Sequence, residues 1–351
     1  MRIALVSTPF VAVPPRGYGG TELVVHELVC GLTAAGHHVT LFATGDSRAR
    51  DLRFVYPAPV WPPDLQAELI HCRHAARAIA RERFDVVHAH VPSMVSFADG
   101  LGTPCVYTLH HVHDDRLTEA YLRRRGVFYV AISARQAQLE PQLACQVIHH
   151  GLDSQSYPLG RGDGDYAAFL GRLAPCKAPD LAVAAARAAG ISIRIAGEIH
   201  PVDATPDWMA VMASALAQPG VLHLGEMGGG ARKARFLGGA RALLMPLRWE
   251  EPFGLVMVEA MLCGTPVIAY ARGAAPEIVD ERTTGFLVEN EDEMAAVLAQ
   301  LDRFDRAGCR LRAEARFSSG RMVRDYERVY ARAIAGAGIL TGRAEESSYA
   351  G

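Results

Sequence analysis

Two glutamates eight positions apart, Glu251 and Glu259, lie in the stretch MPLRWEEPFGLVMVEAMLCGTPVIAY. A strand is expected to end at Met245–Pro246, and a helix to begin at Pro252, because proline suits a first helical position. Glu251 would then precede the helix and Glu259 would lie about two turns into it. This arrangement predicts an anion site flanked by two carboxylates that can accept hydrogen bonds from sugar hydroxyls. The alternative is a helix N-terminus that carries acids only because of the helix dipole.

The backbone of this stretch adds N–H donors to the predicted anion site. If the helix begins at Pro252, the N–H groups of Phe253, Gly254 and Leu255 have no partner within it. We expect these donors to point toward the anion, with the positive end of the helix dipole behind them.

A second stretch, FLGRLAPCKAPDLAV, carries two cations in a loop between a predicted strand and a predicted helix. Arg172 and Lys177 both follow the strand end, and Lys177 is one of only two lysines among 36 basic residues; the other is Lys233. A pair of cations on one such loop suits a diphosphate, with each charge-assisted contact contributing about 1.5–3 kcal/mol. The alternative is a solvated surface pair.

Near the amino terminus the chain reads PPRGYGGTELVVHEL, with glycines at positions 17, 19 and 20. The stretch has no G-K-[ST] ending and fails the G-x-G-x-x-G spacing, so neither a Walker loop nor a dinucleotide fingerprint is indicated. Gly19 and Gly20 would let backbone N–H groups approach phosphate oxygens closely. Thr21 is predicted to cap the following helix. We interpret the loop as a mobile lid.

Histidines gather after two predicted strands. His88 and His90 end one strand, whereas His110, His111 and His113 follow another. Their spacing matches neither H-E-x-x-H nor another compact ligand set. Hydrogen bonding in a cleft is the favoured interpretation, and a metal site is the alternative.

The elements that must position these residues alternate between strand and helix along the chain. The strands are Val-, Ile- and Leu-rich runs without polar alternation, as in parallel sheets buried on both faces. The loop-like stretch DSQSYPLGRGDGD interrupts the pattern once. We therefore expect an α/β protein of two doubly wound, Rossmann-like domains facing each other across a cleft. The predicted segments are residues 1–156, residues 157–318, a helix at 319–338 that returns to the first domain, and a flexible tail at 339–351.

Composition narrows the class of protein. The chain has 351 residues, of which 50% are hydrophobic and 21% charged, with a formal net charge of −2. That balance is typical of a globular protein and gives no reason to expect nucleic acid as a partner. Seven scattered cysteines without a C-x-x-C pair favour a reducing cytoplasm. We expect neither a signal peptide nor a transmembrane segment.

The motifs occur together, and in one order, in a known family. EPFGLVMVEAMLCGTPVIA, with GRLAPCKAPDLA upstream and TTGFLV downstream, resembles the nucleotide-sugar-binding domain of retaining glycosyltransferases of family 4. GYGGTELVVHELVCGLTAAGHHVTLFAT, FDVVHAH, VYTLHH and VIHHGLD resemble the amino-terminal motifs of that family. The resemblance covers roughly Arg2 to Tyr330. It implies the two-domain GT-B fold, a nucleoside-diphosphate sugar as co-substrate, and neither a cofactor nor a bound metal.

The resemblance also implies roles for individual residues in donor binding and transfer. Arg172 and Lys177 would hold the diphosphate, and Glu251 would bind hydroxyls of the transferred sugar. Phe253, Gly254 and Leu255 would offer backbone amides, and Glu259 would bind the ribose. Further expected contacts are His110 over the sugar, Gly19 and Gly20 over the phosphates, Gly225 within residues 224–227 near the base, and Tyr18, Thr21 and His111 on the acceptor side.

The sequence departs from the family pattern in three places. Ala178 follows the lysine where the family usually has glycine, and residues 225–239 are unusually rich in glycine. His111 stands beside His110, so which of the two lies over the sugar stays open. The acceptor, whether small molecule, lipid or glycan, carries no signature. The run Arg123–Arg125 is read as a solvated face, with peripheral contact to the inner face of a membrane as the alternative.

Other functions remain as alternatives. A nicotinamide-dependent dehydrogenase would need a third glycine on the first turn and an acid after the second strand, for which Asp46 is a poor candidate. Another two-domain sugar enzyme, either a phosphorylase or a nucleotide-sugar epimerase, fits the same motifs. A binding module without catalysis would keep the donor site, but the presence of Lys177, Glu251 and His110 argues against it.

Overall fold

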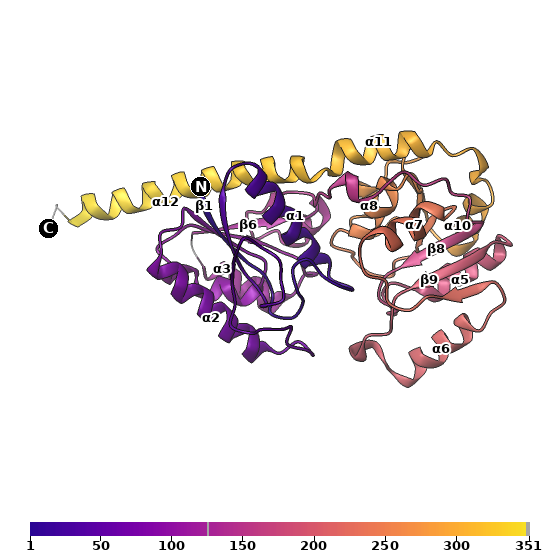
Figure 1. Cartoon of the computed structure of the whole chain (residues 1–351), viewed down its shortest axis with the longest axis horizontal. Helices are drawn as coiled ribbons and strands as arrows, with labels where there is room; N and C mark the ends of the chain where they lie inside the picture. The colour runs from indigo at the N-terminus through magenta and orange to yellow at the C-terminus, as the bar shows by residue number, and fades with distance from the viewer. Residues whose placement is uncertain (125, 349–351) are drawn as a thin grey trace. The chain divides into compact units, whose positions relative to one another are not determined.

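The computed structural model describes residues 1–124 and 126–348, which form two compact units (Figure 1). Unit 1 contains Met1–Gly151 and the segment from Ser319 onward, and unit 2 contains Leu152–Ser318. The chain thus passes between the units twice. The first passage lies after Gly151, a few residues before the boundary predicted after residue 156, and the second lies at the predicted position.

Unit 1 is built on a parallel sheet of seven strands in the order β3-β2-β1-β4-β5-β6-β7. Strand order therefore reverses between β1 and β4, which pair through Ile3 and Val86. The strand β3 at one edge of this sheet is short. The strands are β1 (Arg2–Val6), β2 (His38–Phe42), β3 (Asp51–Arg53), β4 (Val86–Ala89), β5 (Cys105–Thr108), β6 (Val127–Ala131) and β7 (Gln146–Val147).

Helices cover the sheet of unit 1 and bury its strands on both faces. The central strands β1, β4 and β5 are almost completely buried, which explains the absence of polar alternation in their sequences. The helices are α1 (Gly20–Ala34), α2 (Leu65–Arg81), the 3₁₀ segment η1 (Pro92–Gly100), α3 (Asp115–Leu122) and α4 (Ala134–Leu139).

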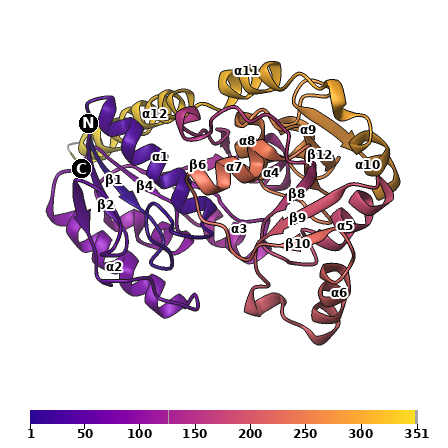
Figure 2. The ribbon, with the colours of Figure 1, turned by 45° about the vertical axis from the view of Figure 1, so that its right-hand side comes forward.

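The final helix, α12 (Ser319–Ser348), belongs to unit 1 and packs on it (Figures 1 and 2). Its Tyr326 and Tyr330 are fully buried. It lies against α1 so closely that a Cβ at Gly31 would come within 2.4 Å of Val323. The helix continues to Ser348, so most of the segment predicted to be a flexible tail is helical; residues 349–351 lie outside the described residues.

Unit 2 repeats the architecture with a six-stranded parallel sheet in the order β10-β9-β8-β11-β12-β13. Its strands are β8 (Tyr166–Leu170), β9 (Ser192–Ala196), β10 (Val221–His223), β11 (Leu243–Met245), β12 (Val267–Tyr270) and β13 (Gly285–Val288). Strand order reverses between β8 and β11. In sheets of this kind, ligands bind beyond the carboxyl ends of the strands at such a reversal.

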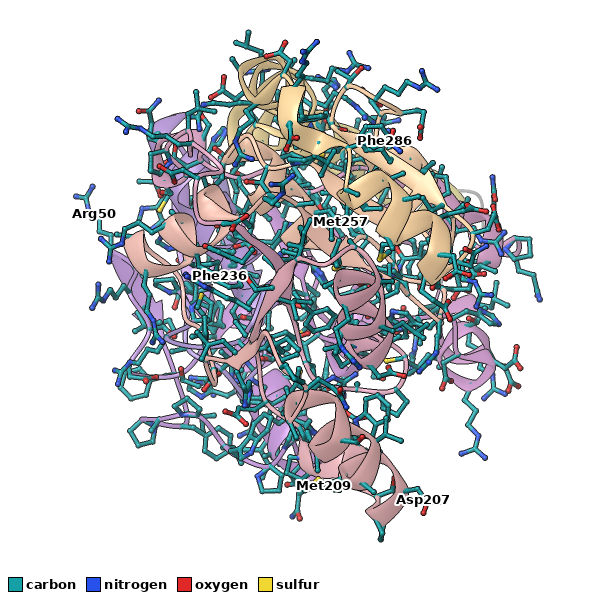
Figure 3. All side chains as sticks on the ribbon, turned by 90° about the vertical axis from the view of Figure 1, so that its right-hand side faces the viewer. Arg50, Asp207, Met209, Phe236, Met257 and Phe286 are labelled. Carbon is teal, nitrogen blue, oxygen red and sulfur yellow. The ribbon has the colours of Figure 1, made fainter. Side chains whose placement is uncertain are left out.

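The helices of unit 2 enclose a core of aliphatic and aromatic side chains that includes Phe169, Ile195 and Leu244. They are α5 (Pro179–Ala188), α6 (Pro206–Leu216), α7 (Ala231–Gly239), α8 (Leu255–Leu262), α9 (Ala275–Ile278), α10 (Glu291–Leu298) and α11 (Arg306–Phe317), with 3₁₀ segments η2 (Ser154–Ser156), η3 (Pro201–Asp203) and η4 (Leu301–Arg303). Helix α6 is the most exposed of them, and Asp207 and Met209 project from it into solvent (Figure 3).

Candidate functional site: two glutamate–lysine pairs and a histidine cluster

The loops that follow β8 and β11 meet at the reversal of strand order in unit 2. Arg248 joins them: its backbone N–H donates to the carbonyl of Cys176, and its guanidinium contacts both carboxylate oxygens of Asp180 at 2.8 and 3.2 Å. This fork-shaped contact between planar groups sets the spacing of the two loops. It thereby brings together Lys177 from the first loop and Glu251 from the second.

Lys177 and Glu251 form a largely buried ion pair. The ammonium of Lys177 contacts Oε2 of Glu251, and only 12% and 9% of the two side chains are exposed. Trp249 donates its indole N–H to the same oxygen at 2.8 Å, and the ammonium also lies 4.7 Å from the centroid of the Trp249 ring. The pair keeps two charges stable away from water, since each has both an ionic and a polar or aromatic partner.

The backbone around Glu251 explains why the helix begins later than predicted. Helix α8 begins at Leu255, not at Pro252, and Gly254 caps it in the left-handed region at φ 82°. The loop is held open because the carbonyl of Glu251 accepts the N–H of Ala274 at 2.9 Å. Gly273 lies against this backbone: a Cβ there would come within 2.2 Å of the nitrogen of Glu251.

Because helix α8 begins at Leu255, only one of the three predicted N–H donors, Leu255, lies in the helix itself. Leu255 opens the helix and supplies one of the N–H groups without an intrahelical acceptor. Phe253 lies before the cap, and its buried ring packs against Phe317 with centroids 6.0 Å apart. The predicted donors therefore lie on the loop and the first turn of α8, and Glu259 lies one turn into the helix.

Glu259 forms the second glutamate–lysine pair of the unit. Oε1 of Glu259 accepts from the ammonium of Lys233 at 2.7 Å and from the hydroxyl of Tyr157 at 2.8 Å. Both bonds go to the same oxygen, so Oε2 has no hydrogen-bond partner among the described residues. The two lysines of the chain thus each hold one of the two glutamates that drew attention in the sequence. Lys233 and Tyr157 were not predicted as site residues.

Arg172 is tied to an acid in the structure. Its guanidinium lies 3.0 Å from Oδ2 of Asp203, in η3, and both side chains are partly exposed. A diphosphate bound by Arg172 would therefore compete with Asp203 for that guanidinium.

Ala178, which stands where the family usually has glycine, has a strained backbone. This residue caps α5 in the left-handed region, at φ 52° and ψ 51°, and it is completely buried. A left-handed conformation costs an L-residue with a side chain about 1–2 kcal/mol, whereas glycine adopts it freely.

The segment near Gly225, expected near the base of the nucleotide, lies at the ends of β9 and β10. Gly225 is in the left-handed region at φ 69°, and its carbonyl accepts the N–H of Gly197 at 2.9 Å. His223 donates at the same turn: its Nε2 lies 2.7 Å from the carbonyl oxygen of Gly197, which can only accept, so Nε2 carries the proton. These bonds join the two loops at the carboxyl edge of the sheet.

In unit 1, the glycine-rich loop leads directly into α1. Helix α1 begins at Gly20 and Gly19 is its cap, so the prediction that Thr21 caps the helix is wrong; no side chain bonds the free N–H groups there. A Cβ at Gly19 would come within 2.7 Å of Pro15, whereas one at Gly20 meets nothing within 4 Å. Tyr18 is 63% exposed. Gly19 is therefore required by packing, and Gly20 is not.

An acid is buried beneath this loop. Glu22, in the first turn of α1, accepts the hydroxyl of Thr8 at 2.6 Å. Burial raises the pKa of the Glu22 carboxyl above its usual value.

The two candidate histidines after β5 differ in how their ring nitrogens are used. His111 bonds through both: Nδ1 lies 2.6 Å from the carbonyl of Val112, and Nε2 lies 2.8 Å from the hydroxyl of Tyr121. His110 bonds only through Nε2, which lies 2.9 Å from Nδ1 of His90. Among the described residues, Nδ1 of His110 has no partner. The structure therefore leaves a ring nitrogen available on His110 and occupies both on His111.

His110 belongs to a cluster of four histidines. Its ring stacks on that of His150 at 5.3 Å and 16°, and the rings of His88 and His90 are 4.0 Å apart. Burial lowers the pKa of His110 to about 3, and it also lowers those of His88, His90 and His150. The cluster is therefore neutral near pH 7. Within the described part of the chain, no group of three potential ligands could hold a metal ion.

Two arginines of the run interpreted as a solvated face, with membrane contact as the alternative, form ion pairs. Arg123 contacts Glu119 at 2.5 Å and Arg124 contacts Asp99 at 2.6 Å, while Arg125 lies outside the described residues. No helix in the described ranges is long and apolar enough to cross a membrane.

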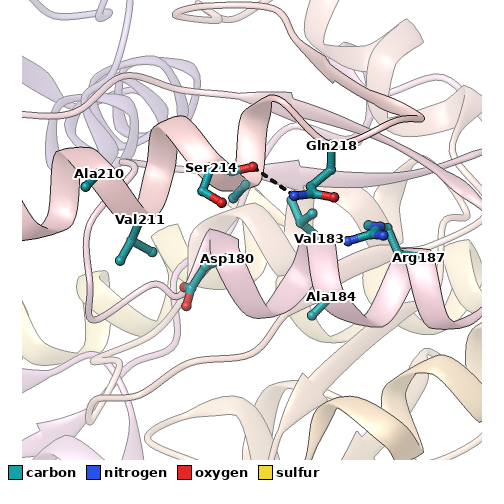
Figure 4. A pocket seen from close by; sticks show the side chains of 9 residues that line it. Asp180, Val183, Ala184, Arg187, Ala210, Val211, Ser214 and Gln218 are labelled. Carbon is teal, nitrogen blue, oxygen red and sulfur yellow. Dashed lines mark hydrogen bonds between the residues drawn. The ribbon is translucent and has the colours of Figure 1, made fainter.

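A hollow of about 500 Å³ lies between α5 and α6 and shares Asp180 with the contact to Arg248 described above (Figure 4). It is lined by small and aliphatic side chains with Asp180, Arg187, Ser214 and Gln218 at its rim, and Gln218 donates to the carbonyl of Ser214 at 3.2 Å. The hollow contains none of the predicted site residues. The candidate site therefore rests on the clustered loops and not on this groove.

Two family models match adjoining parts of the chain. The model described as Glycosyltransferase Family 4 matches residues 18–156, and that described as Glycosyl transferases group 1 matches residues 158–305. The first ends and the second begins close to the passage from unit 1 to unit 2.

Named relatives agree with these models. The D-inositol 3-phosphate glycosyltransferase of Mycolicibacterium smegmatis strain mc(2)155 is 29% identical over 95% of this chain and 91% of its own length. That of Mycobacterium avium strain 104 is 37% identical over 37% of this chain and 31% of its own length.

Solved structures share the architecture of the whole chain. AviGT4, a glycosyltransferase involved in avilamycin A biosynthesis, is 26% identical, covers 95% of this chain and 98% of its own, and superposes with a TM-score of 0.74. The sucrose-phosphate synthase of Thermosynechococcus elongatus superposes with a TM-score of 0.80 over 95% of this chain and 99% of its own, at 19% identity.

Proposed function

Because the chain belongs to the group 1 glycosyltransferases of GT-B type, we propose that it transfers a sugar from a nucleoside-diphosphate sugar to a hydroxyl group of an acceptor. The donor is linked to UDP or GDP. Support for UDP comes from the solved structures of Anabaena HepE in complex with UDP and with UDP-glucose, at 18% identity. The relatives named D-inositol 3-phosphate glycosyltransferase support a hydroxyl acceptor.

The observation that carries this proposal is the pair of glutamates, each held by one of the chain's two lysines, at the carboxyl edge of the sheet of unit 2. Lys177 and Arg172 hold the diphosphate. Glu251 binds hydroxyls of the transferred sugar, and Oε2 of Glu259 accepts from the ribose. Gly225 lies near the base, and the backbone N–H groups of the loop and first turn of α8 face the donor.

We propose that transfer retains the anomeric configuration and needs no metal. The bond between the anomeric carbon and the leaving phosphate oxygen breaks, and a bond to the acceptor oxygen forms on the same face of the sugar. The acceptor's proton passes to the leaving phosphate. The protein then contributes positioning and charge stabilisation, because Lys177 and Arg172 meet the charge that develops on the phosphate.

Unit 1 supplies the remaining groups in this proposal. His110 contacts a hydroxyl of the substrate through its available nitrogen, and Gly19 and Gly20 shape the backbone near the phosphates. Tyr18, Thr21 and the neighbourhood of His111 contact the acceptor. We place the reaction in the cytoplasm because all seven cysteines are free thiols, and at most peripheral contact with a membrane is required.

The test is incubation of the full chain with a panel of UDP- and GDP-linked sugars, followed by NMR of the products. The expected result is release of the nucleoside diphosphate, with acceptors or slowly with water, and a product of the donor's own anomeric configuration. Phosphate-dependent turnover would indicate a phosphorylase instead. Isomerisation of the donor without transfer would indicate an epimerase, and binding without turnover would indicate a binding module.

Glu251→Ala provides the matched variant for this assay. We expect it to abolish transfer while the free nucleoside diphosphate still binds, since Glu251 is assigned to the sugar. Loss of nucleotide binding in calorimetry would reassign Glu251 to the nucleotide.

A further inference from the structure

His110 and His90 share one hydrogen bond whose proton can lie on either ring. Nε2 of His110 is 2.9 Å from Nδ1 of His90, so one nitrogen donates and the other accepts. His90 is buried, with 2% of its surface exposed, and its other nitrogen, Nε2, is buried without a hydrogen-bond partner among the described residues. The position of the shared proton therefore determines whether Nε2 of His90 is an N–H without an acceptor or a lone pair without a donor.

The two arrangements differ in cost. If His110 donated, the proton of His90 would lie on Nε2, and a buried N–H would have no acceptor. Such an orphan donor is costly in a buried site and is rarer than an orphan acceptor. If His90 donates through Nδ1, its Nε2 carries only a lone pair, and His110 receives the bond at Nε2. The single proton of neutral His110 then lies on Nδ1.

The surroundings hold both rings in these positions. His88 packs beside His90 and is itself fixed at both nitrogens, 2.8 Å from the hydroxyl of Tyr330 and 2.8 Å from that of Thr108. His150 stacks on His110. Because Tyr330 lies on α12, the returning helix helps to hold the cluster.

We infer that His90 is a positioning residue that makes His110 a neutral hydrogen-bond donor, with its proton on Nδ1, and thereby prevents His110 from acting as a base. The inference rests on the proposed function for its catalytic meaning. A histidine in this state can donate to a hydroxyl oxygen of the sugar, but its only lone pair is already engaged by His90. The acceptor's proton must then go elsewhere, which agrees with transfer to the leaving phosphate.

The direct test is long-range proton–nitrogen NMR of the full chain labelled with ¹⁵N-histidine, with the His110 signals assigned by their loss in His110→Gln. Protonated and lone-pair nitrogens resonate far apart, so the tautomer can be read in the free protein. We expect the proton on Nδ1 of His110. A proton on Nε2, or a charged ring at pH 7, would overturn the inference.

Two variants separate positioning from packing. His90→Asn places an amide donor where Nδ1 was, so His110 should keep its tautomer and kcat should fall by less than about threefold. His90→Leu fills the site without a donor, so the tautomers should mix and kcat should fall about tenfold with KM little changed, the effect of one lost hydrogen bond. Equal kcat in both variants would contradict the inference.

The NMR result does not depend on turnover. If no donor is consumed by the wild-type chain, the proposed function fails, while the tautomer of His110 still supports or overturns the role of His90. If His90→Leu does not fold, the wild-type tautomer and the behaviour of His90→Asn decide the question.

Discussion

The two units share a fold but handle polar groups at their sheet edges in opposite ways. Unit 2 buries charge in pairs: Lys177 with Glu251, and Lys233 with Glu259. Unit 1 buries histidines that stay neutral, since burial lowers the pKa of each ring in the cluster. Under the proposed function, unit 2 would stabilise a charged ligand electrostatically, whereas unit 1 would supply hydrogen bonds of defined direction.

The largest effect is expected from Lys177→Met. The transfer rate should fall by about 10²- to 10³-fold, because the developing charge on the phosphate loses a preorganised cation. The fold should also lose about 3–5 kcal/mol of stability, since Glu251 is left largely buried without its partner. Steady-state kinetics and urea unfolding measure the two effects.

The double variant Lys177→Met with Glu251→Gln is the control. It removes the unpaired charge, so stability should recover while transfer stays lost. A normal kcat with only a raised KM in Lys177→Met would contradict the role of the lysine in the transition state.

The second glutamate–lysine pair should affect binding of the nucleotide. Glu259→Gln should weaken binding of the free nucleoside diphosphate by about tenfold or more, because a charged acceptor for the ribose is lost. Tyr157→Phe removes only one of the two bonds that orient Oε1 and should have a smaller effect of the same sign. Calorimetry measures both, and an unchanged dissociation constant for Glu259→Gln would remove Glu259 from the site.

The neutral cluster of unit 1 predicts a pH dependence of stability. Burial lowers the folded-state pKa of each of its histidines below the unfolded value of 6.5, to about 3 for His110 and well below 6.5 for the other three. Below pH 6.5 the unfolded chain therefore binds protons that the folded chain does not, and stability falls as the pH is lowered. The loss for each histidine approaches about 1.4 kcal/mol per pH unit once the pH is well below 6.5.

His90→Asn tests this linkage. Urea unfolding between pH 7 and pH 5 should show an average slope about 1 kcal/mol per pH unit shallower in the variant than in the wild type. An identical slope in the two proteins would mean that His90 is already protonated in the folded state.

The smallest effect is expected at the strained loop beside Lys177. Ala178→Gly should raise the free energy of unfolding by up to about 1 kcal/mol, because glycine adopts φ 52° without a Cβ penalty. Ala178→Val, which is branched at Cβ, should lower it. A melting-temperature series measures this, and a loss of stability in the glycine variant would show that Ala178 is not strained.

The sequence was informative wherever a feature depends on local patterning. Buried parallel strands can be recognised because both faces are covered, so their apolar runs show no alternation. The helix after Glu251 was placed too early, because Pro252 fits a first helical position equally well and the bond from Ala274 to the carbonyl of Glu251 is tertiary. Thr21 was predicted as a cap because threonine is a common cap residue, but helix α1 begins before it, at Gly20.

The partners of the site residues depend on contacts distant in sequence. In the sequence, Lys233 was noted only as a rare lysine. No local pattern indicated that Lys233 and Tyr157 would contact the carboxylate of Glu259. The proximity of His90 and His110 could have been predicted from the sequence. The strands β4 and β5 are consecutive and pair in parallel, with His88 opposite Val106. Their following residues therefore end at one edge of the sheet. The direction of the hydrogen bond still required the burial of His90.

The central claim is tested most directly by following UDP- and GDP-linked sugars with the full chain by proton NMR, without added metal. The account predicts that one donor is consumed, that its nucleoside diphosphate is released, and that the first sugar product keeps the donor's anomeric configuration. A first product of inverted configuration, or a donor that binds and remains intact with every acceptor and with water, would contradict it.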